Sequence, residues 1–241
     1  MSEAILFYDE KKIFFFDGKT NQELIEPLQI DSFNKFVSSR LLNLIQSNII
    51  DKGMEIKAIV SDSRDGLLIP DELYNPDKRE GFYKLNYSSI PSGKIIKEQK
   101  ISILNATLIY SCKQWFHDFF KSNFNGTPLL NRSCLHLKKT LLDRDGNKDI
   151  HIIIKNDTFD IIKLKNKSLN SYNSIEYSSM NDIIYFLIGH IEKLNIKNPS
   201  VNIFGSEKQL TEIKNITSKM DSLKSNQYHF NSNTNFLDLI S

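Results

Sequence analysis

The sequence predicts an α/β protein of two lobes, each built on a mixed sheet. Two observations support this prediction. Residues 150–205 contain three short apolar runs, an amphipathic helical pattern and a fourth apolar run that ends at Gly205, which is the order β-β-β-α-β. Residues 5–60 show the same order of elements without similar letters. We therefore expect a duplicated fold in which helices cover each sheet.

The composition is that of a globular protein. The chain has 241 residues, of which 40% are hydrophobic and 25% are charged, so it can bury a full core in two lobes. Its net charge of +2 arises from 31 basic and 29 acidic side chains and does not indicate a nucleic-acid partner. No apolar run approaches the roughly 18 residues that span a bilayer, and the N-terminus lacks the features of a signal peptide. We expect a cytoplasmic protein with no membrane span, in which Cys112 and Cys134 are reduced and buried.

The first lobe begins with three predicted strands, because polar turn residues at 9–12 and 17–20 separate three apolar runs. These runs are 5–8, 13–16 and 23–30. Asp31 or Ser32 can then cap a helix, and residues 54–60 predict a fourth strand. The apolar positions of this helix are Phe33, Phe36, Val37, Leu41, Leu44 and Ile45.

The middle of the chain is less regular. Its expected elements are a strand at 67–74 that leads into a short helix, an exposed turn-rich segment at 75–93, strands at 100–104 and 106–110, and helices at 112–124 and 135–142. We place the boundary between the lobes within Asp143–Asp149, where polar residues and a glycine follow each other. The first lobe is then residues 1–145 and the second lobe is residues 146–241.

The second lobe has the clearest pattern. Strands at 150–155 and 159–165 and an Asn/Ser/Tyr-rich third strand should be antiparallel neighbours. Ser179 and Asp182 have the spacing of a capping box at the start of a helix. We expect this helix to bury Ile184, Leu187, Ile188 and Ile191 against Ile152, Ile154, Ile161 and Phe204. After Gly205, a second amphipathic helix should carry Leu210, Ile213, Ile216 and Met220.

The tail is mostly polar. It contains one short strand candidate at 228–230, and residues 236–240 are apolar enough to dock on the body of the protein.

Gly18-Lys19-Thr20 is similar to the end of a phosphate-binding P-loop. That loop needs a glycine five residues before its second glycine, and Ile13 stands there within a predicted strand. We therefore interpret the segment as the turn of a hairpin.

Asp143, Asp145, Asn147 and Asp149 place oxygen ligands on alternate residues, as a calcium loop does. The glycine of this segment stands at the fourth position instead of the sixth, and Ile154 stands where a bidentate Glu is needed. We interpret the segment as a solvated turn between the lobes.

Cys112, His117, Cys134 and His136 could supply four zinc ligands. On helices, however, the first two would diverge by about 140° and the last two by about 200°. His117 and Asp118 form a candidate acid/base pair, but their aromatic neighbours favour a packing role for the histidine. We expect no metal site, no catalytic residue and no cofactor.

Segments 166–177, 182–185 and 201–205, together with 67–74 in the first lobe, resemble an uncharacterised bacterial family of actin-like domains of unknown function. This family belongs to the actin-like ATPase superfamily. The resemblance covers nearly the whole chain and implies two ribonuclease-H-like lobes in an actin-like ATPase arrangement. It implies no particular activity.

The resemblance also implies where nucleotide motifs would lie. Asp9 matches the acid of the first phosphate loop, but Glu10 and Lys11 replace its small residues. The second phosphate loop requires Asp and glycines after Ile154, and the sequence has residues 155–157, Lys-Asn-Asp, instead. Side chains obstruct such loops because the backbone N–H groups must approach the phosphate closely.

The adenosine motif of the superfamily ends a strand in two glycines. Gly205 matches the first glycine, and Ser206 replaces the second. Asp9 and Gly205 are thus weak relics of a nucleotide site.

Two functions remain open. The first is a non-enzymatic actin-like module that binds an unidentified protein partner as a scaffold or adaptor, with a degenerate nucleotide cleft. The second is a nucleotide-binding switch or ATPase whose unconventional phosphate contacts come from Lys11 and Lys155. The sequence leaves the oligomeric state open.

Overall fold

A computed structural model describes residues 2–20, 22–142, 149–165, 168–194, 198–224 and 226–232. Within these residues the chain forms two compact units. The first unit contains Met1–Ser63 and Leu67–Leu135, and the second contains Arg64–Gly66 and His136–Thr234. The lobe boundary at Asp143–Asp149 falls mostly on residues 143–148, which lie outside the described residues. The division into residues 1–145 and 146–241 therefore stays a prediction.

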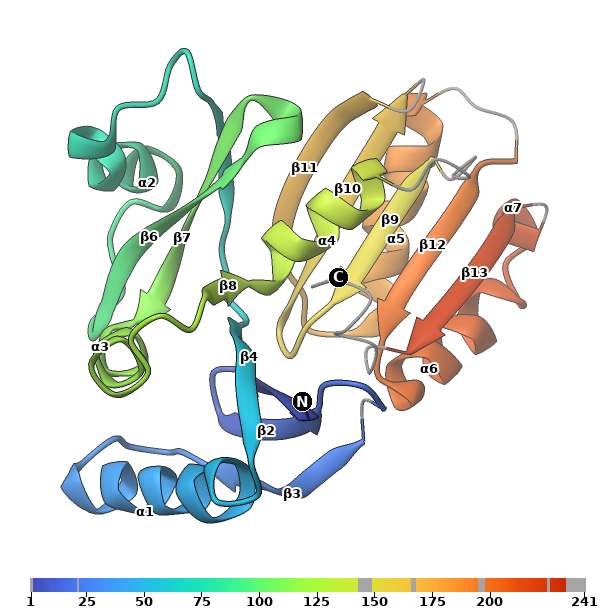
Figure 1. Ribbon diagram of the computed structural model, residues 1–241. Coiled ribbons are helices and arrows are strands. Elements are labelled where there is room, and N and C mark those ends of the chain that lie inside the picture. Colours follow the sequence, from blue (N-terminus) through green and yellow to red (C-terminus); the bar gives the residue numbers. More distant parts are fainter. Residues whose placement is uncertain are drawn as a thin grey trace. The chain divides into compact units, whose positions relative to one another are not determined.

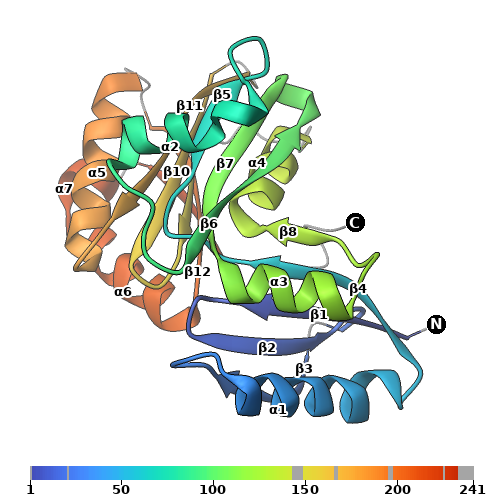
Figure 2. The same cartoon turned by 90° about the vertical axis from the view of Figure 1, so that its left-hand side faces the viewer.

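The main sheet of the first unit has the strand order β3-β2-β1-β4-β8 (Figures 1 and 2). Its strands are β1 (Ser2–Tyr8), β2 (Lys12–Asp17), β3 (Glu23–Gln29), β4 (Met54–Ser61) and β8 (Leu129–Asn131). The first three strands are antiparallel neighbours, as predicted, while β4 is parallel to both β1 and β8. Strand β8 was not predicted, because its 3 residues are too few to show an alternating pattern.

Helix α1 (Lys35–Ile45) follows β3 and buries Leu41 and Ile45. The predicted caps are wrong: the side chain of Asn34 accepts a hydrogen bond from the backbone N–H of Val37 at 3.0 Å. The predicted apolar face is also too wide, since Phe36 is 76% exposed. A π-helical segment (Gln46–Ile50) continues α1.

An inserted sheet of three antiparallel strands lies between β4 and β8 in the sequence. It contains β5 (Leu67–Pro70), β6 (Lys94–Ile101) and β7 (Ala106–Lys113) in the order β5-β7-β6. Helix α2 (Arg79–Tyr87) lies against this sheet (Figure 2) and buries Tyr83 beside Ile96 and Ile109. Most residues of the segment 75–93 are exposed, as predicted, but helix α2 within it was not predicted. The sheet provides the surface that this short helix covers.

The remaining boundaries of the first unit also need correction. Strand β6 ends at Ile101, and residues Ser102–Leu104, predicted as strand, form a 3₁₀ turn. Cys112, predicted in a helix, belongs to β7, and helix α3 (Gln114–Asn123) begins after it. Helix α4 (Arg132–Leu142) begins earlier than predicted.

The sheet of the second unit has the strand order β11-β10-β9-β12-β13 (Figure 1). Its strands are β9 (Ile150–Ile154), β10 (Thr158–Lys165), β11 (Ser168–Glu176), β12 (Ser200–Gly205) and β13 (Gln227–Ser232). Three antiparallel strands again precede two that run parallel to the first of them. The predicted duplication of the fold is confirmed.

Helices α5 (Met180–Leu194) and α6 (Glu207–Thr217) cover one face of this sheet (Figure 1), and the short α7 (Asp221–Lys224) precedes β13. Ile184 and Leu187 are buried in the predicted cluster, and Ile188 and Ile191 pack against it while partly buried. Phe204 was wrongly assigned to this core. Its ring lies 5.0 Å from that of His136, because side chains alternate along a strand and this one leaves the α5 face.

The start of α5 is stabilised by its own acid. Asp182 Oδ2 accepts hydrogen bonds from the backbone N–H groups of Ser178 and Ser179 at 2.8 and 2.9 Å. Residues 236–240, predicted to dock, lie outside the described residues. Among the helices that the structure describes, none has the length and apolar character of a membrane span.

Candidate functional site

The parallel strands of each unit end at one edge of its sheet, where ligands of α/β proteins usually bind. In the first unit this edge contains the ends of β1, β4 and β8, and in the second unit it contains the ends of β9, β12 and β13. The segments with weak nucleotide motifs follow β1, β9 and β12. Their geometry decides whether a phosphate can enter.

The Asp9 turn, residues 9–12, connects β1 to β2. Asp9 Oδ1 accepts hydrogen bonds from the backbone N–H groups of Lys11 and Lys12 at 2.9 and 2.7 Å. A bound phosphate would need backbone N–H groups of this kind. The carboxylate of Asp9 therefore occupies the N–H donors that a phosphate would use. Asp9, predicted as a relic of a nucleotide site, instead stabilises the turn that contains it.

Glu10 fixes the same turn to the inserted sheet. Its Oε1 lies 2.6 Å from Lys94 Nζ, and the two side chains are only 16% and 6% exposed. The hydroxyl of Tyr8 donates a hydrogen bond to the carbonyl of Glu10 at 2.9 Å, and burial raises the pKa of Tyr8 so that the phenol remains a donor. The left-handed backbone of Glu10, with φ of 75°, is held by these contacts.

A buried ion pair connects the ends of β4 and β8, and the sequence reasoning missed it. Arg132 Nη1 lies 2.9 Å from Asp62 Oδ2, with side chains 4% and 7% exposed. The side chain of Asn131 donates to Ser63 Oγ at 2.9 Å and accepts from the backbone N–H of Cys134 at 3.2 Å, so it caps α4. The cap could have been predicted, because Asn131 follows two leucines and is a favoured residue at the start of a helix. The pairing of Asp62 with Arg132 could not, because the two residues are far apart in the sequence.

The Lys155 turn, residues 155–157, connects β9 to β10. Lys155 Nζ donates to Asp160 Oδ1 at 2.9 Å, and both side chains are buried. The hydroxyl of Tyr177 donates to the carbonyls of Lys155 and Asn156 at 2.8 and 3.2 Å. The turn thus directs its lysine into the unit and ties its carbonyl groups to a side chain from beyond β11.

The end of β12 is closed in a similar way. The backbone N–H of Ser206 donates to Gln209 Oε1 at 2.8 Å, and Ser206 Oγ accepts from the backbone N–H of Gln209 at 3.4 Å. Gln209 Nε2 also donates to the Lys155 carbonyl at 3.0 Å and to Tyr177 Oη at 3.2 Å. The N-terminus of α6 is therefore capped from within the unit. Gly205 has a packing role, since a Cβ there would lie 3.3 Å from Ile154 Cδ1.

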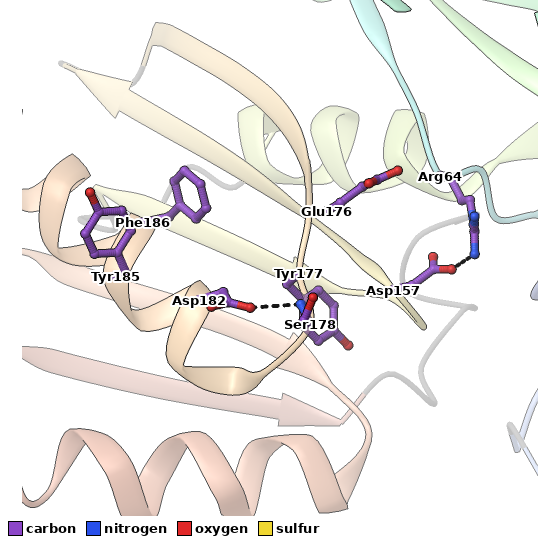
Figure 3. A pocket seen from close by; sticks show the side chains of 8 residues that line it. All are labelled: Arg64, Asp157, Glu176, Tyr177, Ser178, Asp182, Tyr185 and Phe186. Atoms are coloured by element: carbon purple, nitrogen blue, oxygen red, sulfur yellow. Dashed lines mark hydrogen bonds and ion pairs between the residues drawn. The ribbon is translucent and has the colours of Figure 1, made fainter.

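A pocket of about 340 Å³ lies beside the Lys155 turn and the start of α5 (Figure 3). It is lined by Arg64, Asp157, Glu176, Tyr177, Ser178, Asp182, Tyr185 and Phe186. Tyr185 and Phe186 lie toward one end, and Arg64 with its ion-pair partner Asp157 lies toward the other. Tyr185 is 74% exposed, although its ring is large and mostly apolar.

The pocket has an acidic and aromatic character. Three carboxylates, Asp157, Glu176 and Asp182, line it together with one cation, Arg64. Hydrogen bonds from the backbone of Ser178, and then of Ser179, lower the pKa of Asp182, so this carboxylate stays ionised. The charge of the lining therefore favours a positively charged group.

The Gly18-Lys19-Thr20 segment lies in the turn between the antiparallel strands β2 and β3. Asp17 Oδ1 accepts from the backbone N–H groups of Lys19 and Thr20 at 2.9 and 2.8 Å. A Cβ at Gly18 would lie 2.8 Å from the carbonyl oxygen of Glu3, so the glycine permits a close approach of the backbones.

The four cysteines and histidines considered for zinc are distributed over three elements. Cys112 is in β7, His117 is in α3, and Cys134 and His136 are in α4. The described residues contain no group of three or more potential metal ligands. Burial raises the pKa of Cys112 to about 12, so this thiol stays protonated.

Most of the segment that is similar to a calcium loop lies outside the described residues. Asp143, Asp145 and Asn147 lie outside the described residues, whereas Asp149 accepts a hydrogen bond from the backbone N–H of Ser200 at 3.0 Å.

The two five-stranded sheets have corresponding strand orders, one in each unit, which defines a protein of the actin-like ATPase fold. A protein of this fold and of unknown function from Bacteroides thetaiotaomicron is similar, with a TM-score of 0.76 and 17% identity over 99% of this chain and 95% of that one. The PilM–PilN type IV pilus biogenesis complex contains a similar chain, with a TM-score of 0.54 and 8% identity over 98% of this chain and 90% of that one. The cytoplasmic domain of Vibrio cholerae EpsL has a TM-score of 0.50 and 9% identity over 100% of this chain and 93% of that one.

Residues 16–222 match the family model described as "Protein of unknown function (DUF3822)", and the chain belongs to this family. No curated protein matches the sequence. The resemblance to a family of actin-like domains of unknown function is confirmed.

Proposed function

We propose that this protein is a non-enzymatic actin-like module that binds a protein partner, as a scaffold or adaptor, and has a degenerate nucleotide site. One observation carries the proposal: side chains of the protein occupy backbone N–H groups in two of the three segments that would hold a nucleotide. Asp9 occupies the donors of the first turn, and Gln209 caps α6. A nucleotide would have to break these bonds before it could form its own.

The alternative was a switch or ATPase with phosphate contacts from Lys11 and Lys155. Lys155 is poorly placed to bind a phosphate, because its buried amine is paired with the carboxylate of Asp160. Withdrawing the lysine would leave Asp160 as an uncompensated buried charge. Lys11 is exposed, but its backbone N–H already donates to Asp9 and is not available to a phosphate.

Calorimetry with Mg-ATP tests the degenerate site. We expect no binding with a dissociation constant below about 10 μM, which corresponds to roughly −7 kcal/mol, and no hydrolysis of ATP. Tighter binding would overturn this part of the proposal and would make Lys11 the first residue to replace.

We place the contact with the partner at the pocket in Figure 3, and we infer that the partner inserts a lysine or arginine side chain there. An exposed tyrosine beside carboxylates can receive such a cation on its ring face, while the carboxylates accept its hydrogen bonds. Tyr and Arg are also the residues that most often dominate protein interfaces, and Tyr185 and Arg64 both line this pocket.

Two similar structures agree with a role in assemblies. EpsL is an inner-membrane component of the type II secretion system, and the PilM–PilN structure is a type IV pilus biogenesis complex. We place the present protein in the bacterial cytoplasm, where cysteines outside disulfides, such as Cys112 and Cys134, are expected.

Copurification with tagged variants tests the partner surface. Tyr185→Ala and Glu176→Gln should both lose a partner that the wild-type protein retains. Phe36→Ala and Glu192→Gln are matched controls, because Phe36 is 76% exposed and neither residue lines the pocket. A partner that is retained equally by Tyr185→Ala and by Phe36→Ala would show that binding occurs elsewhere.

A further inference from the structure

Three side chains of the first unit form a hydrogen-bonded row outside the candidate nucleotide segments. Lys97 lies on β6, and His117 and Asp118 lie on α3. The distance from Lys97 Nζ to His117 Nε2 is 2.9 Å, and the distance from His117 Nδ1 to Asp118 Oδ1 is 3.1 Å. The row thus consists of an amine, an imidazole and a carboxylate.

The hydrogen bonds of the row define the proton positions. Asp118 can only accept, so His117 Nδ1 carries a hydrogen. The Lys97 ammonium can only donate, so His117 Nε2 offers its lone pair. An imidazole in this state is a base that is within reach of the lysine and is oriented by a carboxylate. This is the arrangement that activates nucleophiles in enzymes.

The surroundings of Lys97 also favour loss of its proton. Burial lowers the pKa of Lys97, and the positive charge of Arg79 and then that of Lys121 lower it further. The negative charge of Glu98 opposes these effects, and the thiol of Cys112 is protonated and contributes no charge at neutral pH. The same cations would attract an anionic reagent.

We propose that Lys97 is an acylation site, at which His117 activates the amine toward anionic acyl donors such as acyl phosphates. The inference is independent of the proposed partner surface, which belongs to the second unit. Acylation would remove the charge of Lys97 and break its hydrogen bond to His117.

The reaction balances without an oxidant or reductant. Lys97 transfers one proton to His117 Nε2, and Asp118 stabilises the imidazolium. The neutral amine attacks the carbonyl carbon of the donor and forms a C–N bond. The bond from that carbon to the phosphate oxygen breaks, with its electron pair on the oxygen. The second amine proton leaves with the phosphate, and His117 returns its proton to water.

Lys100 is a matched internal control, because it lies on the same strand and is 65% exposed while Lys97 is half-buried. Its amine is paired with the carboxylate of Asp71 at 3.0 Å. Simple accessibility would make Lys100 the faster lysine. A faster Lys97 would require chemical activation.

The test is acetylation of the full chain with acetyl phosphate, followed by mass spectrometry of the initial rates at both lysines. A general base typically contributes about 10²–10⁴-fold, so we expect Lys97 to react at least about tenfold faster than Lys100. His117→Gln should lower the ratio of the two rates severalfold, and Asp118→Asn should lower it less. The rate at Lys97 should also level off at a lower pH than the rate at Lys100.

Because a folding defect would change both rates, the ratio is the relevant measure. Asp118 is exposed, so the Asp118→Asn variant should keep the fold. A ratio of one or less in the wild-type protein would overturn the proposal. An elevated ratio that neither substitution changes would also overturn it, because His117 would then have no role.

Discussion

Leu187 provides a quantitative test of how the second unit is stabilised. Its side chain is 0% exposed and packs in the cluster between α5 and the sheet, which contains Ile152, Ile154 and Ile161. Replacing Leu by Ala removes three carbon atoms. At about 0.8 kcal/mol for each buried methylene group, the transfer effect is roughly 2.4 kcal/mol, and the cavity left behind raises the expected destabilisation to about 2–5 kcal/mol.

Urea denaturation followed by circular dichroism and by tyrosine fluorescence would measure this effect. Tyr185→Ala is the matched control on the same helix, because this side chain is 74% exposed and its loss should change the stability by less than about 0.5 kcal/mol. An unchanged denaturation midpoint for Leu187→Ala would show that the helix presents another face to the sheet. Two transitions would show that the units unfold separately. In that case, Leu187→Ala should shift only the midpoint of the transition that belongs to the second unit.

Three further predictions follow from single contacts. Asp62→Asn should destabilise the first unit by about 3–5 kcal/mol in chemical denaturation, because Arg132 would lose its buried partner; a loss below about 1 kcal/mol would contradict this role. Asn34→Ala should cost about 1 kcal/mol by removing the cap of α1, and Asn34→Ser should restore most of it. Asp182 has a lowered pKa in the folded protein, so its stabilising contribution is present above the unfolded pKa and is lost as the pH falls through the folded pKa. Asp182→Asn should therefore reduce the acid-induced loss of stability in melting curves recorded from pH 6 to pH 3.

The candidate site could be predicted only in part. The sequence shows that side chains replace glycines after β1 and β9, which argues against a phosphate loop. It does not show that Asp9 binds the N–H groups of its own turn, although an Asp at the start of a turn often does so. The contacts of Gln209 and Tyr177 with the Lys155 turn could not be predicted, because they join positions 54 and 22 residues apart.

The elements that local periodicity and turn residues specify were determined by the sequence itself. The strands β1 to β3, β9 and β10 lie where apolar runs between turn residues predict them, and helix α5 lies where helical spacing predicts it. Tertiary structure decided the elements without such a pattern. Helix α2 forms because the inserted sheet provides a surface against which it packs. Strand β8 forms because β4 provides an edge with which it pairs. The pocket likewise depends on the pairing of Arg64 with Asp157, two charges that only the folded chain brings together.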